Sequence, residues 1–355
     1  MFKFGIHKRE QLTPDHLEGF FRARKFIALD LYNALDDYPP GDRDRIQGRM
    51  LRRFSNQNGT FKNTYVRRFE DFDILAANSV RSAFPANREI RVHDIGASDG
   101  RTSCAFYDTL SGIYGPRLKF VASDYAPFLY VVRRKNSTRR VIVDERENIL
   151  QIITPPFVFN VIHPEKKLLY PFNHFIRYFV NRRYARPLML AYKAGERDVE
   201  RSRVDLLCYE CRANCASKDN FRFISYDIFS PPTERFDVIR AMNVLNLIYF
   251  SREDLMKAVT NIFLSLEEGG LFITGSNLEA GTRVNGGIYK KSGGRLEKLE
   301  GSGNGSQVDD LIQAIRDTPG ETGCDAYEEQ EAGALKHTKE YSASTPGWRK
   351  AGAKS

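Results

Sequence analysis

The stretch RVHDIGASDGRTS, residues 91–103, decides the fold. It begins as a short apolar strand that carries Asp94, continues in a turn with Gly96, Ser98 and Gly100, and then enters a helix. Small residues let the backbone approach a ligand closely, and the first turn of a helix offers unpaired N–H groups. An acid two positions before the first glycine suits a ligand with a charged amino group and would repel a pyrophosphate. The stretch therefore predicts a strand–turn–helix unit that binds a small molecule.

From Glu89 onward, short apolar strands alternate with helices, which is typical of βαβ units and a parallel sheet. Ser251 and Asp254 form a capping-box pattern at the start of one of these helices, and Gly269-Gly270 is expected to end it. We expect five strands of the parallel sheet at 91–95, 118–123, 221–226, 236–241 and 271–275. Two further strands, at 287–291 and 295–299, are expected to form an antiparallel edge pair.

The chain divides into three predicted regions. Residues 1–86 are expected to form an N-terminal helical segment, with a first helix that runs from Pro14 to about Leu35. Residues 87–316 form the main domain, with an insertion at about 131–206 that includes short strands. We expect an insertion because the predicted strand ends at 124 and 227 lie 103 residues apart, whereas one βαβ unit needs only about 30 residues. Residues 317–355, rich in Gly, Ser, Glu and Lys, are expected to be a disordered tail.

The bulk properties limit the partners and the compartment. The chain has 355 residues and a net charge of +9, so an anionic partner and a merely solvated basic surface both remain open. The N-terminus has no apolar region typical of a secretory signal, and no run of about 18 apolar residues occurs. The five cysteines are odd in number, and we interpret them as reduced thiols of a cytoplasmic protein.

The glycine turn and the later strand ends together resemble the class I S-adenosylmethionine-dependent methyltransferases. The D-x-G-x-x-x-G turn resembles their first motif, although that family usually has glycine where Ser98 stands. A dinucleotide fingerprint, G-x-G-x-x-G, also requires glycine at that position. The other similar segments are KFVASDY (119–125), ISYDIF (224–229), FDVIRAMNVLN (236–246) and LEEGGLFITG (266–275).

This resemblance implies the fold, the cofactor and the residues that would bind it. The implied fold class is α/β, with a Rossmann-like, doubly wound, mostly parallel sheet and an antiparallel edge strand. Asp94 would hold the methionine portion of S-adenosyl-L-methionine, Asp124 the ribose hydroxyls, and Asp227 with the Ile228 N–H the adenine. The complete implied set is Asp94, Gly96, Ala97, Ser98, Gly100, Asp124, Asp227, Ile228 and Asn243.

The predicted function is methyl transfer to an unidentified acceptor. Two alternatives are a non-catalytic cofactor-binding or scaffold module of the same fold, and a nucleotide-dependent oxidoreductase. The run NVLNLIYF, residues 243–250, also resembles the chemotaxis receptor methyltransferases, although Asn246-Leu247 interrupts their tighter pattern. No catalytic base is identifiable from the sequence.

Four side chains are candidate neighbours of the reacting methyl group: His93, Tyr125, Asn243 and Tyr249. We favour the interpretation that His93 packs against the sheet and that Tyr249 lies in the core.

Two other motifs have competing interpretations. Cys208, Cys211 and Cys215 have C-x2-C-x3-C spacing, and three thiolates could in principle hold an iron–sulfur cluster. Zinc needs a fourth ligand, and none is nearby in the sequence, so we favour reduced thiols and predict no metal. The segment 171–186, PFNHFIRYFVNRRYAR, is expected to be an amphipathic helix. It could pack as a lid or lie on an anionic membrane surface. Its expected apolar face consists of Phe172, Phe175, Ile176, Phe179 and Val180. Nucleic-acid binding through the scattered basic clusters also remains open.

Overall fold

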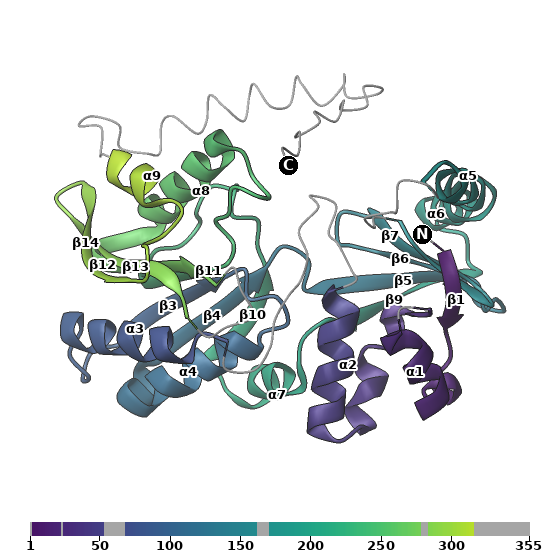
Figure 1. Cartoon of the computed structure of the whole chain (residues 1–355), viewed down its shortest axis with the longest axis horizontal. Helices are drawn as coiled ribbons and strands as arrows, with labels where there is room; N and C mark the ends of the chain where they lie inside the picture. The colour runs from purple at the N-terminus through teal and green to yellow at the C-terminus, as the bar shows by residue number, and fades with distance from the viewer. Residues whose placement is uncertain (1, 23, 53–67, 162–169, 278–282, 316–355) are drawn as a thin grey trace, which may run out of the picture. The chain divides into compact units, whose positions relative to one another are not determined.

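The computed structural model describes residues 2–22, 24–52, 68–161, 170–277 and 283–315, and these form an α/β structure with two mixed sheets (Figure 1). The expected tail lies outside the described residues. Within the described residues, no helix has the length and apolar character needed to cross a membrane.

The first sheet contains the seven strands expected for the main domain outside the insertion. Its strands, in spatial order, are β10 (Phe221–Ser225), β4 (Leu118–Asp124), β3 (Ile90–Ile95), β11 (Phe236–Met242), β12 (Leu266–Ser276), β13 (Asn285–Ser292) and β14 (Arg295–Ser302). The first five are parallel, and β13 and β14 are antiparallel to their neighbours, as expected. In chain order, the five parallel strands lie in the order 3-2-1-4-5, which is the order of a doubly wound sheet.

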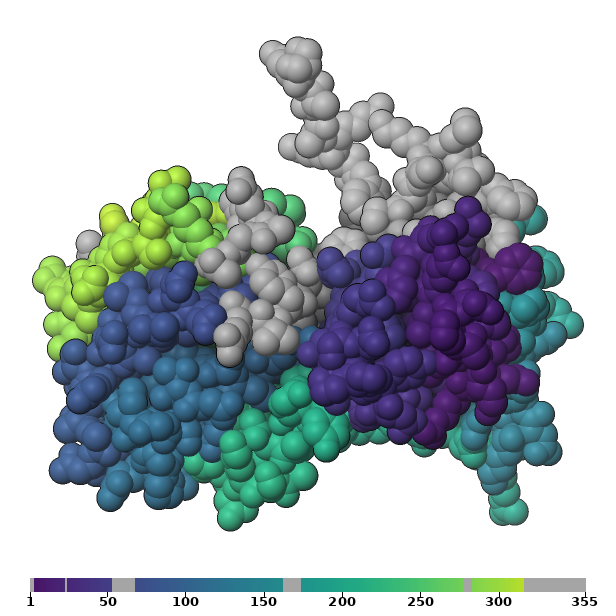
Figure 2. Space-filling model, turned by 60° about the horizontal axis from the view of Figure 1, so that its bottom comes forward, coloured from purple at the N-terminus to yellow at the C-terminus, as the bar shows by residue number. Residues whose placement is uncertain are grey.

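Helices cover both faces of this sheet (Figure 1). One face packs against α3 (Glu70–Ala83), α4 (Arg101–Tyr114) and α7 (Tyr209–Ser217), and the other against α8 (Arg252–Ser265) and α9 (Asp309–Ala314). Phe120 lies in the core on the α4 side and the next residue, Val121, in the core on the α8 side, because successive strand residues point to opposite faces. In Figure 2, α3 and α4 form the blue part of the surface, with α7 below it in green.

The second sheet combines the front of the chain with the insertion. Its strands, in spatial order, are β2 (Phe26–Ile27), β1 (Phe2–Ile6), β8 (Phe157–Asn160), β7 (Ile149–Thr154), β6 (Arg140–Val143), β5 (Phe128–Arg134) and β9 (Val199–Asp205). All neighbouring pairs are antiparallel except β1 and β2. The insertion therefore does not form its sheet alone: β1 pairs directly with β8, across about 155 residues of chain.

Helices also lie on both faces of the second sheet. One face packs against residues of α1 (Pro14–Phe21), α2 (Pro40–Arg52) and the 3-10 turns η2 (Leu29–Leu31) and η3 (Asn33–Asp37). The other face packs against residues of α5 (Tyr170–Val180), the π-helical turn η6 (Asn181–Ala185) and α6 (Arg186–Lys193). Two further short turns among the described residues are η1 (Arg9–Gln11) and η4 (Gly115–Arg117).

The structure corrects the expected first helix, which ends at Phe21 and does not continue to Leu35. Phe26 and Ile27 form β2 instead, because pairing with β1 buries both side chains and overrides their helical spacing. The prediction of a wholly helical front segment is thus wrong for β1 and β2.

The structure also corrects the expected role of the double glycine at 269–270. Helix α8 has the expected Ser251–Asp254 capping box but ends at Ser265, and β12 begins at the next residue. Gly269 has φ +79°, and a Cβ on Gly270 would lie 2.7 Å from the Glu267 carbonyl oxygen. The two glycines therefore serve an irregular start of the strand, where its register with β11 shifts, and do not end the helix.

Candidate functional site

The carboxyl ends of the parallel strands bring most of the predicted site to one edge of the first sheet. Ile95, the last residue of β3, pairs with Ser123 of β4 on one side and Ala241 of β11 on the other. The residues that follow these strands therefore emerge side by side. Strand order reverses between β3 and β11, and in doubly wound sheets ligands bind outside the carboxyl ends at such a point.

The turn after β3 has a backbone that requires small residues. Gly96, Ser98 and Gly100 all have positive φ, at +74°, +58° and +83°. A Cβ on Gly96 would lie 1.9 Å from a methyl carbon of Val244, and one on Gly100 would lie 2.4 Å from the Cys211 sulfur. The turn is thus packed between the segment after β11 and helix α7, and both glycines are required by the protein's own packing.

Asp124 is fixed beside this turn. The Ser98 N–H donates to Asp124 Oδ2 at 2.8 Å, and the Ala126 N–H donates to Oδ1 at 3.2 Å. The Ala97 N–H donates to the Ser123 carbonyl at 2.8 Å, which ties the turn to the end of β4. The Ser98 hydroxyl is buried and has no hydrogen-bond partner among the described residues. The structure therefore brings the predicted turn and the predicted strand-end acid together.

Asp227 lies next to Asp124 at the end of β10. The Tyr226 N–H donates to the Asp124 carbonyl at 3.0 Å. The Asp227 carboxylate accepts from the Phe229 N–H at 3.1 Å and lies 3.4 Å from an Arg146 guanidinium nitrogen. Ile228 is buried, and its carbonyl accepts from Asn261 Nδ2 at 3.0 Å. Asp124, the last residue of β4, and Asp227, two residues after β10, thus lie at the same edge of the sheet.

Asp94 has a different environment, inside the layer between the sheet and the helices α3 and α4. Its side chain is 1% exposed. Arg240 Nη1 lies 2.9 Å from both carboxylate oxygens, and the Ser103 hydroxyl donates to Oδ2 at 2.6 Å. The Arg240 guanidinium also forms a bidentate pair with Asp73 of α3. Asp94 therefore belongs to a buried ionic network that joins β3 and β11 to the helices α3 and α4.

The network perturbs the ionisation of its members. Burial raises the pKa of Asp73 to about 6, although Arg240 lowers it. Burial lowers the pKa of Arg240, and the carboxylates of Asp73 and Asp94 more than offset this, so the arginine stays charged. Sequence reasoning missed Arg240 and Asp73. A signal was present, because an arginine in the middle of the apolar strand FDVIRAM needs a buried partner.

Asn243, the predicted site residue after β11, is held in an unusual backbone conformation. Its φ is +60°, and its side-chain amide pairs reciprocally with Asn277, at 2.9 Å to the Asn277 Oδ1 and 3.1 Å from the Asn277 N–H. Arg68 Nε donates to the same Asn277 oxygen at 2.9 Å. A non-glycine residue in this region is strained and persists where the surroundings fix it.

The other candidate neighbours separate into buried and exposed groups. His93 is buried against Tyr226 and Phe236, and its Nε2 lies 2.8 Å from the Ser123 hydroxyl, which confirms that it packs against the sheet. Burial lowers the pKa of His93 to about 3, so this ring is neutral near pH 7. Tyr249 is 38% exposed, so the expectation that it fills the core is wrong. The Tyr125 ring lies under the Arg146 guanidinium, 4.0 Å from ring centroid to carbon.

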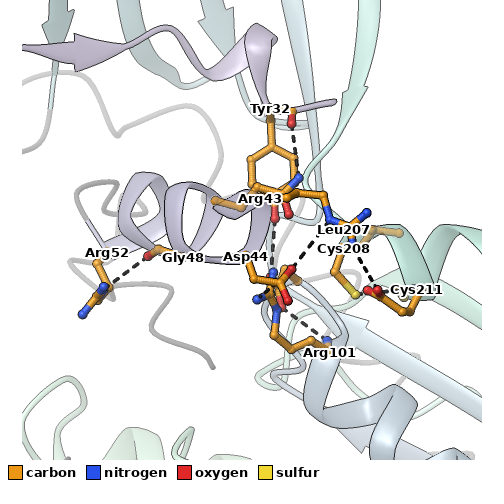
Figure 3. A network of polar contacts seen from close by, with 12 residues as sticks. Tyr32, Arg43, Asp44, Gly48, Arg52, Arg101, Leu207, Cys208 and Cys211 are labelled. Carbon is orange, nitrogen blue, oxygen red and sulfur yellow. Dashed lines mark hydrogen bonds and ion pairs between the residues drawn. The ribbon is translucent and has the colours of Figure 1, made fainter. Parts of the chain in front are cut away.

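A polar network joins the glycine turn to the front of the chain (Figure 3). Asp99, within the turn, is fully buried and pairs with Arg101, at 3.0 Å from Nε. The Tyr32 hydroxyl donates to Asp99 at 3.4 Å, and the Arg101 guanidinium also lies 3.4 Å from a carboxylate oxygen of Asp44 in α2. Burial first, and the Asp99 charge second, raise the pKa of Tyr32. Tyr32 and Asp44 of the front segment thus contact Asp99 and Arg101, at the end of the glycine turn, from outside the first sheet.

The structure adds a fourth thiol to the cysteine motif. Cys104, in the first turn of α4, receives hydrogen bonds from Cys208 and Cys211, and these lower the pKa of Cys104. The bond to Cys104, followed by burial, raises the pKa of Cys208, and the bonds to Cys104 and Cys215, followed by burial, raise the pKa of Cys211. Cys215 bonds to Cys211. This proximity could not be predicted from the sequence, because Cys104 lies on α4 whereas the other three cysteines lie at α7. In the described part of the chain, no group of three or more histidine, cysteine or acidic side chains is arranged to hold a metal ion.

The expected amphipathic face of segment 171–186 is only partly buried. Ile176 and Val180 pack against the second sheet, whereas Phe175 and Phe179 are 66% and 59% exposed. The side chain of Phe172 lies outside the described residues. The expectation of membrane contact stays a prediction.

No protein-family model matches the chain, and no curated protein matches it in sequence. Solved structures do match it, at low similarity. The S-adenosylmethionine-bound amino pentose methyltransferase CalS10 from Micromonospora echinaspora matches with a TM-score of 0.29 and 12% identity, over 64% of this chain and 60% of that one. The N-methyltransferase NodS from Bradyrhizobium japonicum matches with a TM-score of 0.27 and 13% identity, over 69% and 72%. The [4+2]-cyclase SpnF matches with a TM-score of 0.27 and 12% identity, over 57% and 44%.

All three matches have identities of 12–13% and TM-scores below 0.3, so they carry no argument about the activity of this chain. The chain spans less than two thirds of two of these structures, at 60% of CalS10 and 44% of SpnF. Because the scores and identities are low, the functional argument depends on the residues of the site.

Proposed function

We propose that this protein is a Rossmann-like methyltransferase that uses S-adenosylmethionine. The observation that carries the proposal is the convergence of three features at one edge of the first sheet. The glycine turn 96–100 and Asn243 follow β3 and β11, between which the strand order reverses, and Asp124 ends β4, the other neighbour of β3.

The residues at this edge fit a sulfonium nucleoside better than a pyrophosphate. Two acids, Asp124 and Asp227, follow neighbouring strands there and would repel a phosphate group. Asp124 would bind the ribose hydroxyls, because a carboxylate accepts hydrogen bonds from a diol well. Asp227 and the Ile228 N–H would bind the adenine. The buried Ser98 hydroxyl, which has no partner among the described residues, would gain one from the ligand.

Asp94 would contribute indirectly. Because Arg240 and Ser103 already bond its carboxylate, it would act as a positioning residue that sets the start of the turn from beneath. This role differs from the one that the resemblance implies, a direct contact with the methionine portion.

The cofactor, when bound, supplies an electrophilic methyl group on sulfur. An acceptor lone pair would form the new bond to the methyl carbon as the carbon–sulfur bond breaks in line. S-adenosylhomocysteine would leave with the electron pair of that bond, and an amine or hydroxyl acceptor would release its proton to water. The protein's part in such a displacement is mainly to position the two reactants and to exclude water. Beyond Asn243, the residues Leu247, Ile248 and Tyr249 are 52%, 76% and 38% exposed, and they would offer an apolar surface to the acceptor.

The test is incubation of the protein with methyl-labelled S-adenosylmethionine and fractionated cell extract. We expect label in one fraction of lipid, RNA, protein or small metabolites, and loss of that label with Asp124→Asn. Asp219→Asn is the matched control, because Asp219 is exposed and precedes β10 at the opposite end of that strand. Cofactor binding without transfer of label to any fraction would support the alternative, a non-catalytic module of the same fold.

A further inference from the structure

The second sheet carries a surface pocket of about 420 Å³ that shares no residue with the site described above. It lies between the segment after β1, the turn η2 and the turn that joins β5 to β6. Its volume is in the range of small-molecule sites, about 300–1,000 Å³. The pocket therefore has the size for a ligand of its own.

The charged side chains that line the pocket are mostly basic. They are Lys8, Arg133, Lys135 and Arg140, with Asp30 as the acid. Arg140 pairs with Asp30, and Arg133 donates from Nε to Glu200. Within the described residues, neither the Lys8 nor the Lys135 ammonium group pairs with a carboxylate, and both side chains are exposed. Two positive charges are thus available at the pocket.

The pocket wall is held by buried interactions. Arg140 is 7% exposed, and its guanidinium binds Asp30 through two nitrogens while also donating to the His7 carbonyl at 2.8 Å. A third nitrogen of Arg140 donates to the Thr138 carbonyl at 3.1 Å, and this bond fixes the turn that carries Lys135. The backbone N–H of Lys135 donates to the Asp198 carbonyl at 2.9 Å. The two lysines therefore project from a preformed frame.

We propose that this pocket binds the phosphate group of a small molecule. Lysine binds phosphate as a point charge, and two unpaired ammonium groups complement a dianion. The Arg140 guanidinium is already paired with the Asp30 carboxylate, so binding of the phosphate group would depend on Lys8 and Lys135. Asn136 and the Thr138 hydroxyl, which also line the pocket, supply polar groups for further hydrogen bonds. The proposal does not depend on the proposed methyl transfer.

Isothermal titration of the full chain with ribose 5-phosphate and with inorganic phosphate, at constant ionic strength, tests the proposal. We expect both to bind, since they share the phosphate, and binding to weaken at least tenfold in Lys8→Ala/Lys135→Ala. The control is Lys119→Ala/Lys257→Ala, which removes two exposed lysines elsewhere and so gives the same net charge. This control should bind within twofold of the wild type. Thermal unfolding of both variants checks that each is folded.

Three results would overturn the proposal. The first is that neither inorganic phosphate nor ribose 5-phosphate binds at concentrations up to about 10 mM. A dissociation constant above that value is weaker than that of ordinary specific sites. The second is equal weakening in the pocket variant and the control, which would indicate non-specific attraction to a basic protein. The third is lysine-dependent binding of a single-stranded RNA oligonucleotide without binding of either small phosphate, which would assign Lys8 and Lys135 to a nucleic-acid surface.

Discussion

Replacement of Arg240 by methionine should strongly destabilise the first sheet. Arg240 is 1% exposed and is the charged partner of two buried carboxylates, those of Asp73 and Asp94. Methionine approximates the length of the aliphatic stem but leaves both acids without their counter-charge. Removing one partner of a buried ion pair costs about 3–5 kcal/mol, because the remaining charge is left desolvated. We expect a loss of this size in the free energy of unfolding.

The loss should depend on pH. Burial raises the pKa of Asp73 to about 6 even with Arg240 present. Protonation below that pH removes one of the two uncompensated charges, so Arg240→Met should cost less at pH 5 than at pH 8. Adding Asp73→Asn to Arg240→Met should recover part of the loss at pH 8, because one buried charge is then gone.

Urea unfolding at pH 5 and pH 8, followed by circular dichroism, measures these free energies. The matched control is Arg252→Met, which removes an exposed arginine paired with the exposed Asp310. Exposed pairs contribute about 0–1 kcal/mol, so this control should change little. If Arg240→Met also cost less than about 1 kcal/mol at pH 8, the ionic support that we assign to Asp94 would be refuted.

Two further predictions concern His93 and helix α5. Because burial lowers the pKa of His93 to about 3, below its ordinary 6.5, the unfolded chain takes up a proton first as the pH falls. The contribution of His93 to the free energy of unfolding is therefore fully present above pH 6.5 and is lost as the pH falls toward 3. The loss amounts to about 2 kcal/mol at pH 5. In His93→Gln, the free energy of unfolding measured with urea should depend less on pH between pH 6.5 and pH 3. If Phe175 and Phe179, both exposed on α5, contact an anionic membrane, Phe175→Ser/Phe179→Ser should reduce sedimentation with phosphatidylserine vesicles. Unchanged sedimentation would leave these residues without a membrane role.

The first sheet was predictable because its signals are local. Each of its five parallel strands contains a short apolar run, and the glycines of the turn 96–100 mark the end of the first of them. The antiparallel pair β13–β14 was predictable because Gly293-Gly294 form a turn signal between two short segments. The second sheet was not, because its order depends on the pairing of β1 with β8, which no local pattern encodes. Strand β2 has only two residues and is recognisable only through its partner.

The candidate site shows the same division. The turn, Asp124 and Asp227 could be predicted because they lie at the ends of strands, and a parallel sheet brings the carboxyl ends of its strands to one edge. The partner of Asp94 could not be inferred, because Arg240 is 146 residues away and its position depends on the register of β11 with β3. Likewise, the contact of Cys104 with Cys208 depends on how α4 and α7 pack.

The central claim is that the edge formed by the turn 96–100 and Asp124 binds S-adenosylmethionine. Isothermal titration with the product, S-adenosylhomocysteine, tests it without knowledge of the acceptor. We expect one molecule bound per chain, with binding weakened at least tenfold in Asp124→Ala, because a hydrogen bond to a charged group contributes about 1.5–3 kcal/mol. Binding to Asp219→Ala should match the wild type. The absence of binding to the wild type at about 1 mM, or equal binding to both variants, would contradict the claim.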